Sequence, residues 1–83
     1  MTKERRSLPR RSANIKAVVV CQGGLARHNA WVLDESESGL RIRLDEPARI
    51  DGDCYVLYGH RMEPFRVVWQ ANRSLGVCFI IAS

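Results

Sequence analysis

The octapeptide ERRSLPRR at residues 4–11 concentrates side chains that bind anions. Four of its eight residues are arginines: Arg5, Arg6, Arg10 and Arg11. A guanidinium is planar and always charged, so it pairs bidentately with phosphate oxygens and stacks on the faces of bases. Pro9 stiffens the segment and disfavours helix at the residue before it. The cluster therefore predicts a phosphate-binding segment, with a solvated basic tail as the common alternative.

A second group of polar residues, DESESG at 34–39, interrupts the apolar pattern further along the chain. Asp34, Ser36 and Gly39 have the spacing D-x-S-x-x-G. An ionised carboxylate accepts two parallel N–H bonds, and guanine offers such a pair in its N1–H and its amino group. The alternative is a polar turn in which Gly39 supplies a positive φ. Together with the arginines, the carboxylate indicates a guanine nucleotide site.

The distribution of charge separates the chain into a basic leader and a near-neutral body. The net charge of the chain is +4. Residues 1–16 hold six basic side chains and one acidic side chain, whereas the remaining residues hold seven basic and eight acidic side chains. General nucleic-acid binders spread basic residues over a face of the fold. Charge confined to one segment favours a small, compact anion instead. We expect a flexible basic leader at residues 1–14 and one folded domain at residues 15–83.

Alternation of apolar and polar residues with a period of two dominates the body, which predicts strands rather than helices. We expect strands at 15–22, 25–33, 40–45, 54–58, 62–70 and 75–82. Gly23 and Gly24 are typical of a two-residue hairpin turn. Six short strands with tight connections predict an all-β fold, a six-stranded antiparallel barrel or a sandwich. Side chains fill so small a barrel, so a ligand must bind outside it, at a rim or under the leader.

Residue types for catalysis are sparse and badly spaced. His28 and His60 have no nearby cysteine or carboxylate at the spacing of a nucleophile or a metal site. We therefore expect no enzyme, no catalytic residues and no metal. The basic start is not followed by an apolar segment, so we expect no signal peptide, no membrane association and a cytoplasmic protein.

The cysteines follow no spacing typical of zinc or a disulfide framework. The chain has an odd number of cysteines and no C-x-x-C motif. Each of the three, Cys21, Cys54 and Cys78, lies in an apolar stretch. We expect all three to be reduced and buried, because free cysteine is among the most buried residue types.

Both motifs have a parallel in one family. RRSLPR at 5–10 and DESESG at 34–39 resemble the R-x-x-x-R and [D/N]-x-S-x-x-G motifs of the PilZ domain, and RVVWQANRSLGVCFI at 66–80 looks like its closing strands. The resemblance implies a six-stranded barrel that binds the bacterial second messenger cyclic di-GMP. By position, Arg6 and Arg10 would form the first motif, and Asp34, Ser36 and Gly39 the second. Many family members continue into a C-terminal helix, which we do not expect here.

The resemblance also implies a signalling adaptor that acts on a separate, unidentified downstream protein. Arg5, just before R-x-x-x-R, would provide charge for a second ligand, so we expect two cyclic di-GMP molecules per chain and no other cofactor.

Trp69 alternates in phase with Phe65 and Val67, which indicates a core residue, whereas a place at the rim would let it stack on a base. Two alternatives remain: a barrel that binds single-stranded nucleic acid, and a PilZ-like interaction module that binds no nucleotide.

Overall fold

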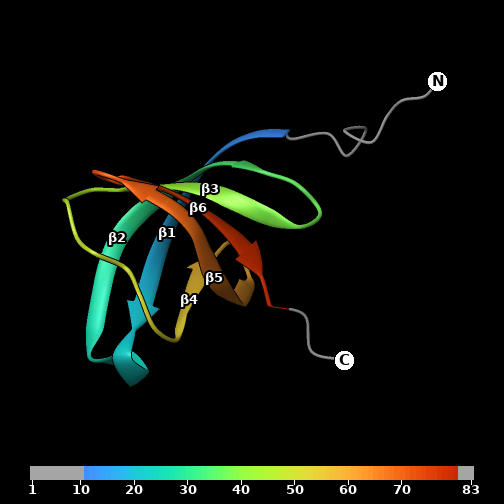
Figure 1. Ribbon diagram of the computed structural model, residues 1–83. Coiled ribbons are helices and arrows are strands. Elements are labelled where there is room, and N and C mark those ends of the chain that lie inside the picture. The colour runs from blue at the N-terminus through green and yellow to red at the C-terminus, as the bar shows by residue number, and fades with distance from the viewer. Residues whose placement is uncertain (1–10, 81–83) are drawn as a thin grey trace.

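The computed structural model describes residues 11–80, which form a closed barrel of antiparallel strands (Figure 1). The strands are β1 (Arg11–Cys21), β2 (Ala26–Glu35), β3 (Gly39–Leu44), β4 (Cys54–Tyr58), β5 (Arg61–Ala71) and β6 (Ser74–Phe79). Their order around the barrel is β1-β2-β3-β6-β5-β4, and β4 pairs again with β1. The expected all-β, six-stranded antiparallel barrel is confirmed. Within residues 11–80 no helix is long and apolar enough to cross a membrane.

Alternate residues of each strand fill the interior. Val19, Val32, Ile42, Leu44, Val56 and Leu75 are completely inaccessible to solvent. In β3, Leu40, Ile42 and Leu44 point inward, while Arg41 and Arg43 are exposed. No polar or charged residue of the described chain is fully buried. Burying one such aliphatic side chain is worth about 1.5–3 kcal/mol, so this filled interior is the main source of stability.

Strand β1 begins at Arg11, four residues before the strand that the sequence predicts. Residues 11–14, assigned to the leader, belong to this strand, because β2 continues to Glu35 and offers backbone partners: Arg11 pairs with Glu35 and Ser12 with Asp34. A bulge between Ser12 and Ile15 interrupts the ladder. The first strand therefore begins at the first residue that the structure describes, and the predicted site residues Arg5, Arg6 and Arg10 lie outside the described residues.

The turn between β1 and β2 differs from the predicted two-residue hairpin. Cys21 pairs with Ala26, so the connection has four residues, and Gln22–Gly24 form a short 3-10 turn, η2. The backbone of Gln22, Gly23 and Gly24 has positive φ values of 55°, 64° and 99°. The two glycines still explain the turn, because glycine adopts such angles without steric cost.

The loop between β3 and β4 closes one end of the barrel. Ile50, only 3% exposed, packs into the core. The Gln70 side chain holds the loop from β5: its Oε1 accepts a hydrogen bond from the Ile50 N–H at 3.1 Å, and its amide donates to the Ala48 carbonyl. The loop's backbone polar groups thus receive partners from a strand twenty residues away.

Two of the three cysteines are joined. Cys21 and Cys54 lie opposite each other in the β1–β4 ladder, with a Cα–Cα distance of 4.3 Å, and form a disulfide. Both are buried, as expected, but the expectation of reduced thiols is wrong for this pair. The sequence separation of 33 residues hid the pairing, since only barrel closure brings β1 beside β4. Cys78 is free and half-buried.

At the opposite end of the barrel, Arg61 contacts both aromatic rings and acidic side chains. Its guanidinium lies 5.1 Å from the centre of the Tyr58 ring and 5.7 Å from that of Phe79. It also forms ion pairs with Glu63 at 2.8 Å and with Glu35 at 3.7 Å. Tyr58 is 4% exposed, and its buried hydroxyl has no hydrogen-bond partner in the structure. Burial raises the pKa of Tyr58 above 10.0, and Arg61 opposes that effect.

We predict that Tyr58→Phe makes the protein more stable. The substitution removes a buried hydroxyl that lacks a partner and keeps the ring, so the free energy of unfolding should rise by about 1 kcal/mol at pH 7. The pKa of Tyr58 is higher in the folded protein than in the unfolded chain, so deprotonation of Tyr58 favours unfolding. In the parent, the free energy of unfolding is unaffected by this titration below pH 10 and falls as the pH rises through the raised pKa. The variant, which lacks the group, should therefore lose less stability than the parent above pH 10.

The measurement is urea unfolding followed by circular dichroism at pH 7 and across the alkaline range. Tyr55→Phe is the matched control, since Tyr55 lies on the same strand and is only partly buried. A Tyr58→Phe variant that is less stable at pH 7 would show that the hydroxyl has a stabilising partner.

Candidate functional site

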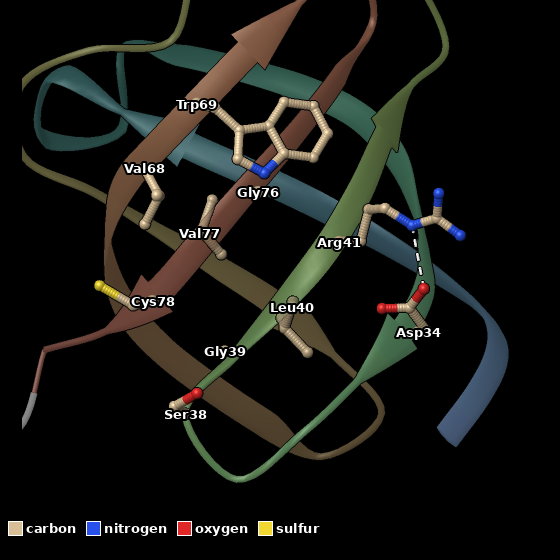
Figure 2. Close-up of a pocket in the computed structure, with 10 residues that line it drawn as sticks. All are labelled: Asp34, Ser38, Gly39, Leu40, Arg41, Val68, Trp69, Gly76, Val77 and Cys78. Atoms are coloured by element: carbon tan, nitrogen blue, oxygen red, sulfur yellow. Dashed lines mark hydrogen bonds and ion pairs between the residues drawn. The ribbon is translucent and has the colours of Figure 1, made fainter. Parts of the chain in front are cut away.

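A pocket of about 430 Å³ lies on the outer face of the barrel, over strands β3 and β6 (Figure 2). Its walls come from the end of β2, from β3, β5 and β6. It is lined by Asp34, Ser38, Gly39, Leu40, Arg41, Val68, Trp69, Gly76, Val77 and Cys78. Three of the residues singled out from the sequence, Asp34, Gly39 and Trp69, are among them. The pocket therefore unites residues that are far apart in the chain.

Direct cross-strand pairing places four of these residues in one row across the outer face. Asp34 of β2 lies opposite Arg41 of β3, Arg41 lies opposite Gly76 of β6, and Gly76 lies opposite Trp69 of β5. Directly opposed residues point to the same face of a sheet. We call Asp34, Arg41, Gly76 and Trp69 the outer row. It presents a carboxylate, a guanidinium, a bare backbone position and an indole side by side.

Two β-bulges bring the ends of the outer row to the surface. Register shifts between Val32 and Asp34 and between Val67 and Trp69 each insert one extra residue. A regular strand would point Asp34 inward with Val32, and Trp69 inward with Val67; the extra residue reverses the phase. Trp69 is 45% exposed, so it is not the core residue that simple alternation predicts.

The Trp69 indole rests on Gly76. A Cβ atom at position 76 would come within 2.6 Å of Trp69 Cε2 and 2.9 Å of Cδ1, and closer still to Nε1. The five-membered ring therefore occupies the space that any other residue would need. One face of the indole packs on the bare backbone of β6, and Figure 2 shows the ring lying over this strand, on the Arg41 side of β5.

Gly39 and Ser36 shape the pocket rather than offer functional groups to it. A Cβ at position 39 would overlap the Val77 carbonyl oxygen and lie 2.9 Å from Cys78 Cα, so glycine permits close approach of β3 and β6. The φ of Gly39 is not positive, in contrast to the turn alternative. Ser36 closes the turn: its N–H donates to the Gly39 carbonyl at 2.9 Å, and its Oγ lies 3.5 Å from the same oxygen. Ser36 does not line the pocket.

The remaining predicted residues, Arg5, Arg6 and Arg10, lie outside the described residues. Arg11 is the first residue that the structure describes, and its guanidinium forms a long ion pair with Glu35 at 3.9 Å. Glu35 directly follows Asp34 in the sequence. Ser12 lies opposite Asp34 and extends the outer row onto β1. The chain thus enters the barrel beside the carboxylate end of the pocket.

Several pocket residues were missed by the sequence analysis, above all Arg41. Its Nε donates a hydrogen bond to Asp34 Oδ2 at 2.9 Å. In the alternating segment LRIRL, Arg41 is indistinguishable from any solvent-facing charged residue. The sequence does not indicate which residue of the neighbouring strand lies opposite it. Gly76 carried a weak signal, because glycine within a strand often marks close approach of another group. Ser38, Val68 and Cys78 carried none.

The chemistry of this pocket suits binding of a flat, polar ring. The outer face of the indole is a stacking surface, and about 1–3 kcal/mol per stacked base is typical of such contacts. The Asp34 carboxylate, at the other end of the outer row, can accept hydrogen bonds from N–H donors. Among residues 11–80, no group of three or more histidine, cysteine or acidic side chains could hold a metal ion.

We predict that the effect of Gly76→Ala depends on Trp69. In the parent protein the new methyl group displaces the indole, which should lower the free energy of unfolding by about 1 kcal/mol. In a Trp69→Ala background the space is open, and alanine should raise the free energy of unfolding by about 0.5–1 kcal/mol, because glycine is unfavourable within a strand. Urea unfolding of the four proteins measures the coupling.

Gly39→Ala is the control for this cycle. Its Cβ meets backbone rather than a side chain, so its cost should be the same with and without Trp69. An equal cost of Gly76→Ala in both backgrounds would contradict the placement of the indole on β6.

Comparison with known proteins adds no assignment. No family model matches the chain, and a search of the curated proteins finds no match. The likeness to the PilZ domain therefore rests on the two motifs and the barrel, and the function must be argued from the pocket.

Proposed function

We propose that this protein is a receptor for cyclic di-GMP that works as a signalling adaptor rather than as an enzyme. The observation that carries the proposal is the outer row: the pairing of β2, β3, β6 and β5 brings the carboxylate of D-x-S-x-x-G and an exposed tryptophan into one pocket of about 430 Å³. Asp34 and Trp69 are separated by 35 positions in the sequence. The volume lies within the range of about 300–1,000 Å³ that is usual for small-molecule sites.

The chemical groups match a guanine base. In this proposal a base stacks on the outer face of Trp69 while Asp34 accepts the N1–H and amino protons of its edge. Among the described residues that line the pocket, two are charged, Asp34 and Arg41, and they are opposite in sign and paired. The phosphates of the ligand therefore need further cations, and Arg5, Arg6 and Arg10 are those that the chain offers just before Arg11.

The location of Arg11 supports a switch in which the ligand draws the leader over the pocket. Arg11 and Ser12 pair with Glu35 and Asp34, so Arg10 comes two positions before Ser12, the residue opposite the carboxylate. Ordering five leader residues costs on the order of 5–10 kcal/mol. Several charge-assisted bonds to phosphate, each worth about 1.5–3 kcal/mol, offset this cost. The ordered leader would present a new surface to a downstream protein.

The proposed function also implies that the protein is located in the cytoplasm. An intracellular second messenger requires a cytoplasmic receptor, and reducing conditions there keep most cysteines as thiols. The buried Cys21–Cys54 disulfide is an exception to this tendency. Binding of single-stranded nucleic acid is less consistent with the site, because the walls formed by residues 11–80 carry a single arginine rather than a basic groove.

We predict that Arg6→Ala, Arg10→Ala and Asp34→Ala each weaken the binding of cyclic di-GMP. The loss of one charge-assisted contact should raise Kd about 10- to 150-fold. Isothermal titration calorimetry with cyclic di-GMP, GTP and a short oligonucleotide measures the affinity. Arg49→Ala is the control, since Arg49 is exposed and does not line this pocket.

These titrations also test the two alternatives. Tight binding of the oligonucleotide instead of cyclic di-GMP would favour the nucleic-acid barrel, and binding of no nucleotide would favour an interaction module. If Arg6→Ala and Arg10→Ala bound cyclic di-GMP like the parent, the leader would not belong to the site.

We further predict two cyclic di-GMP molecules per chain, mutually intercalated, at saturating ligand. Two ligands bring four phosphate charges together, and like charges this close need extra cations such as Arg5. Arg5→Leu should shift the calorimetric stoichiometry from two toward one, with a smaller loss of affinity for the first ligand. A stoichiometry of one for the parent protein would defeat this prediction.

A further inference from the structure

Arg41 is bonded to the carboxylate that the proposed function assigns to guanine. Its Nε donates to Asp34 Oδ2 at 2.9 Å from the directly opposed position on the next strand. The Asp34 side chain is 14% exposed and that of Arg41 is 51% exposed. Figure 2 shows this contact at the pocket wall, with the second carboxylate oxygen turned away from the guanidinium. The contact is thus directional and engages one of the two oxygens.

The hydrogen bond restricts the rotation of the carboxylate without using up its capacity to accept others. An aspartate rotates about two side-chain bonds, and its terminal torsion is broad. A donor fixed to Oδ2 from a neighbouring strand holds the plane of the group in one orientation. Each carboxylate oxygen has two acceptor positions, so Oδ2 can accept from Arg41 and from a ligand together. The bond from Arg41 on β3 therefore constrains the plane of the carboxylate.

Orientation matters for guanine in particular. Its N1–H and amino group are parallel donors, and both are satisfied only when the two carboxylate oxygens lie in the plane of the base. A carboxylate in another orientation accepts one bond and no longer distinguishes guanine from hypoxanthine, which lacks the amino group. Orientation therefore controls selectivity for the amino group, and not only affinity.

We propose that Arg41 is a positioning residue that makes the pocket selective for guanine by fixing the plane of the Asp34 carboxylate. This inference rests on the proposed function, since it concerns the same ligand. A cation that only attracted phosphate would act differently: its removal would weaken guanine and hypoxanthine ligands by the same factor. The ratio of the two affinities separates these roles.

The experiment titrates cyclic di-GMP and its inosine analogue, cyclic di-IMP, into the parent, Arg41→Ala and Arg41→Lys by calorimetry. The parent should prefer cyclic di-GMP by about 10-fold or more, the usual effect of one charge-assisted hydrogen bond. In Arg41→Ala this ratio should fall to about one- to threefold. Arg41→Lys keeps the charge but lacks the planar Nε–H, so it should retain more affinity than Arg41→Ala and still lose most of the selectivity.

Arg43→Ala is the matched control, because Arg43 is exposed on the same face of β3 but does not line the pocket. It should keep the parent's ratio. If Arg41→Ala weakens both ligands equally and keeps the ratio, the positioning role is overturned while the proposed function stands. If the parent binds neither ligand, the proposed function itself fails and this inference fails with it.

Discussion

The closed barrel has to fill its interior with its own side chains, and every other property of the molecule depends on this constraint. Six strands enclose a core of aliphatic residues with Phe65 and the Cys21–Cys54 pair, and no polar residue of the described chain is fully buried among them. In the part of the chain that the structure describes, these side chains fill the interior, as expected for so small a barrel. Binding chemistry must therefore be placed on the outer face, where side chains of a strand normally face water singly.

Local irregularities of two strands turn part of that outer face into a pocket. The bulges after Val32 and Val67 reverse the phase of the residues that follow, so Asp34 and Trp69 leave the inward series of their strands. Both bulges flank the β3–β6 pair, one on each side. Bulges commonly re-aim side chains at functional positions. Here they place a carboxylate and an indole at the two ends of one cross-strand row.

Glycine and charge pairing complete this arrangement. Gly76 lets the indole lie against β6, and Gly39 lets β3 approach the backbone of β6. Arg41 neutralises Asp34 across the ladder, so the described walls of the pocket carry no net charge. An anionic ligand must therefore find its counter-charges elsewhere in the chain. Under the proposed function, the excess of basic residues in the first sixteen positions would supply these counter-charges.

The sequence alone determined the class of fold and three residues of the pocket, Asp34, Gly39 and Trp69. Period-two alternation, as in LRIRL, specifies which residues of a strand point inward, and this pattern is sufficient to predict six strands that form a barrel or a sandwich. The carboxylate of Asp34 was also evident, because its residue type and spacing indicate its chemistry. The tertiary structure decided which residues meet. A one-residue bulge reverses the side to which Trp69 points, barrel closure pairs Cys21 with Cys54, and register brings Arg41 opposite Asp34. Such pairings depend on hydrogen bonds between strands distant in the chain, and the local pattern of one strand carries no information about its partner's register.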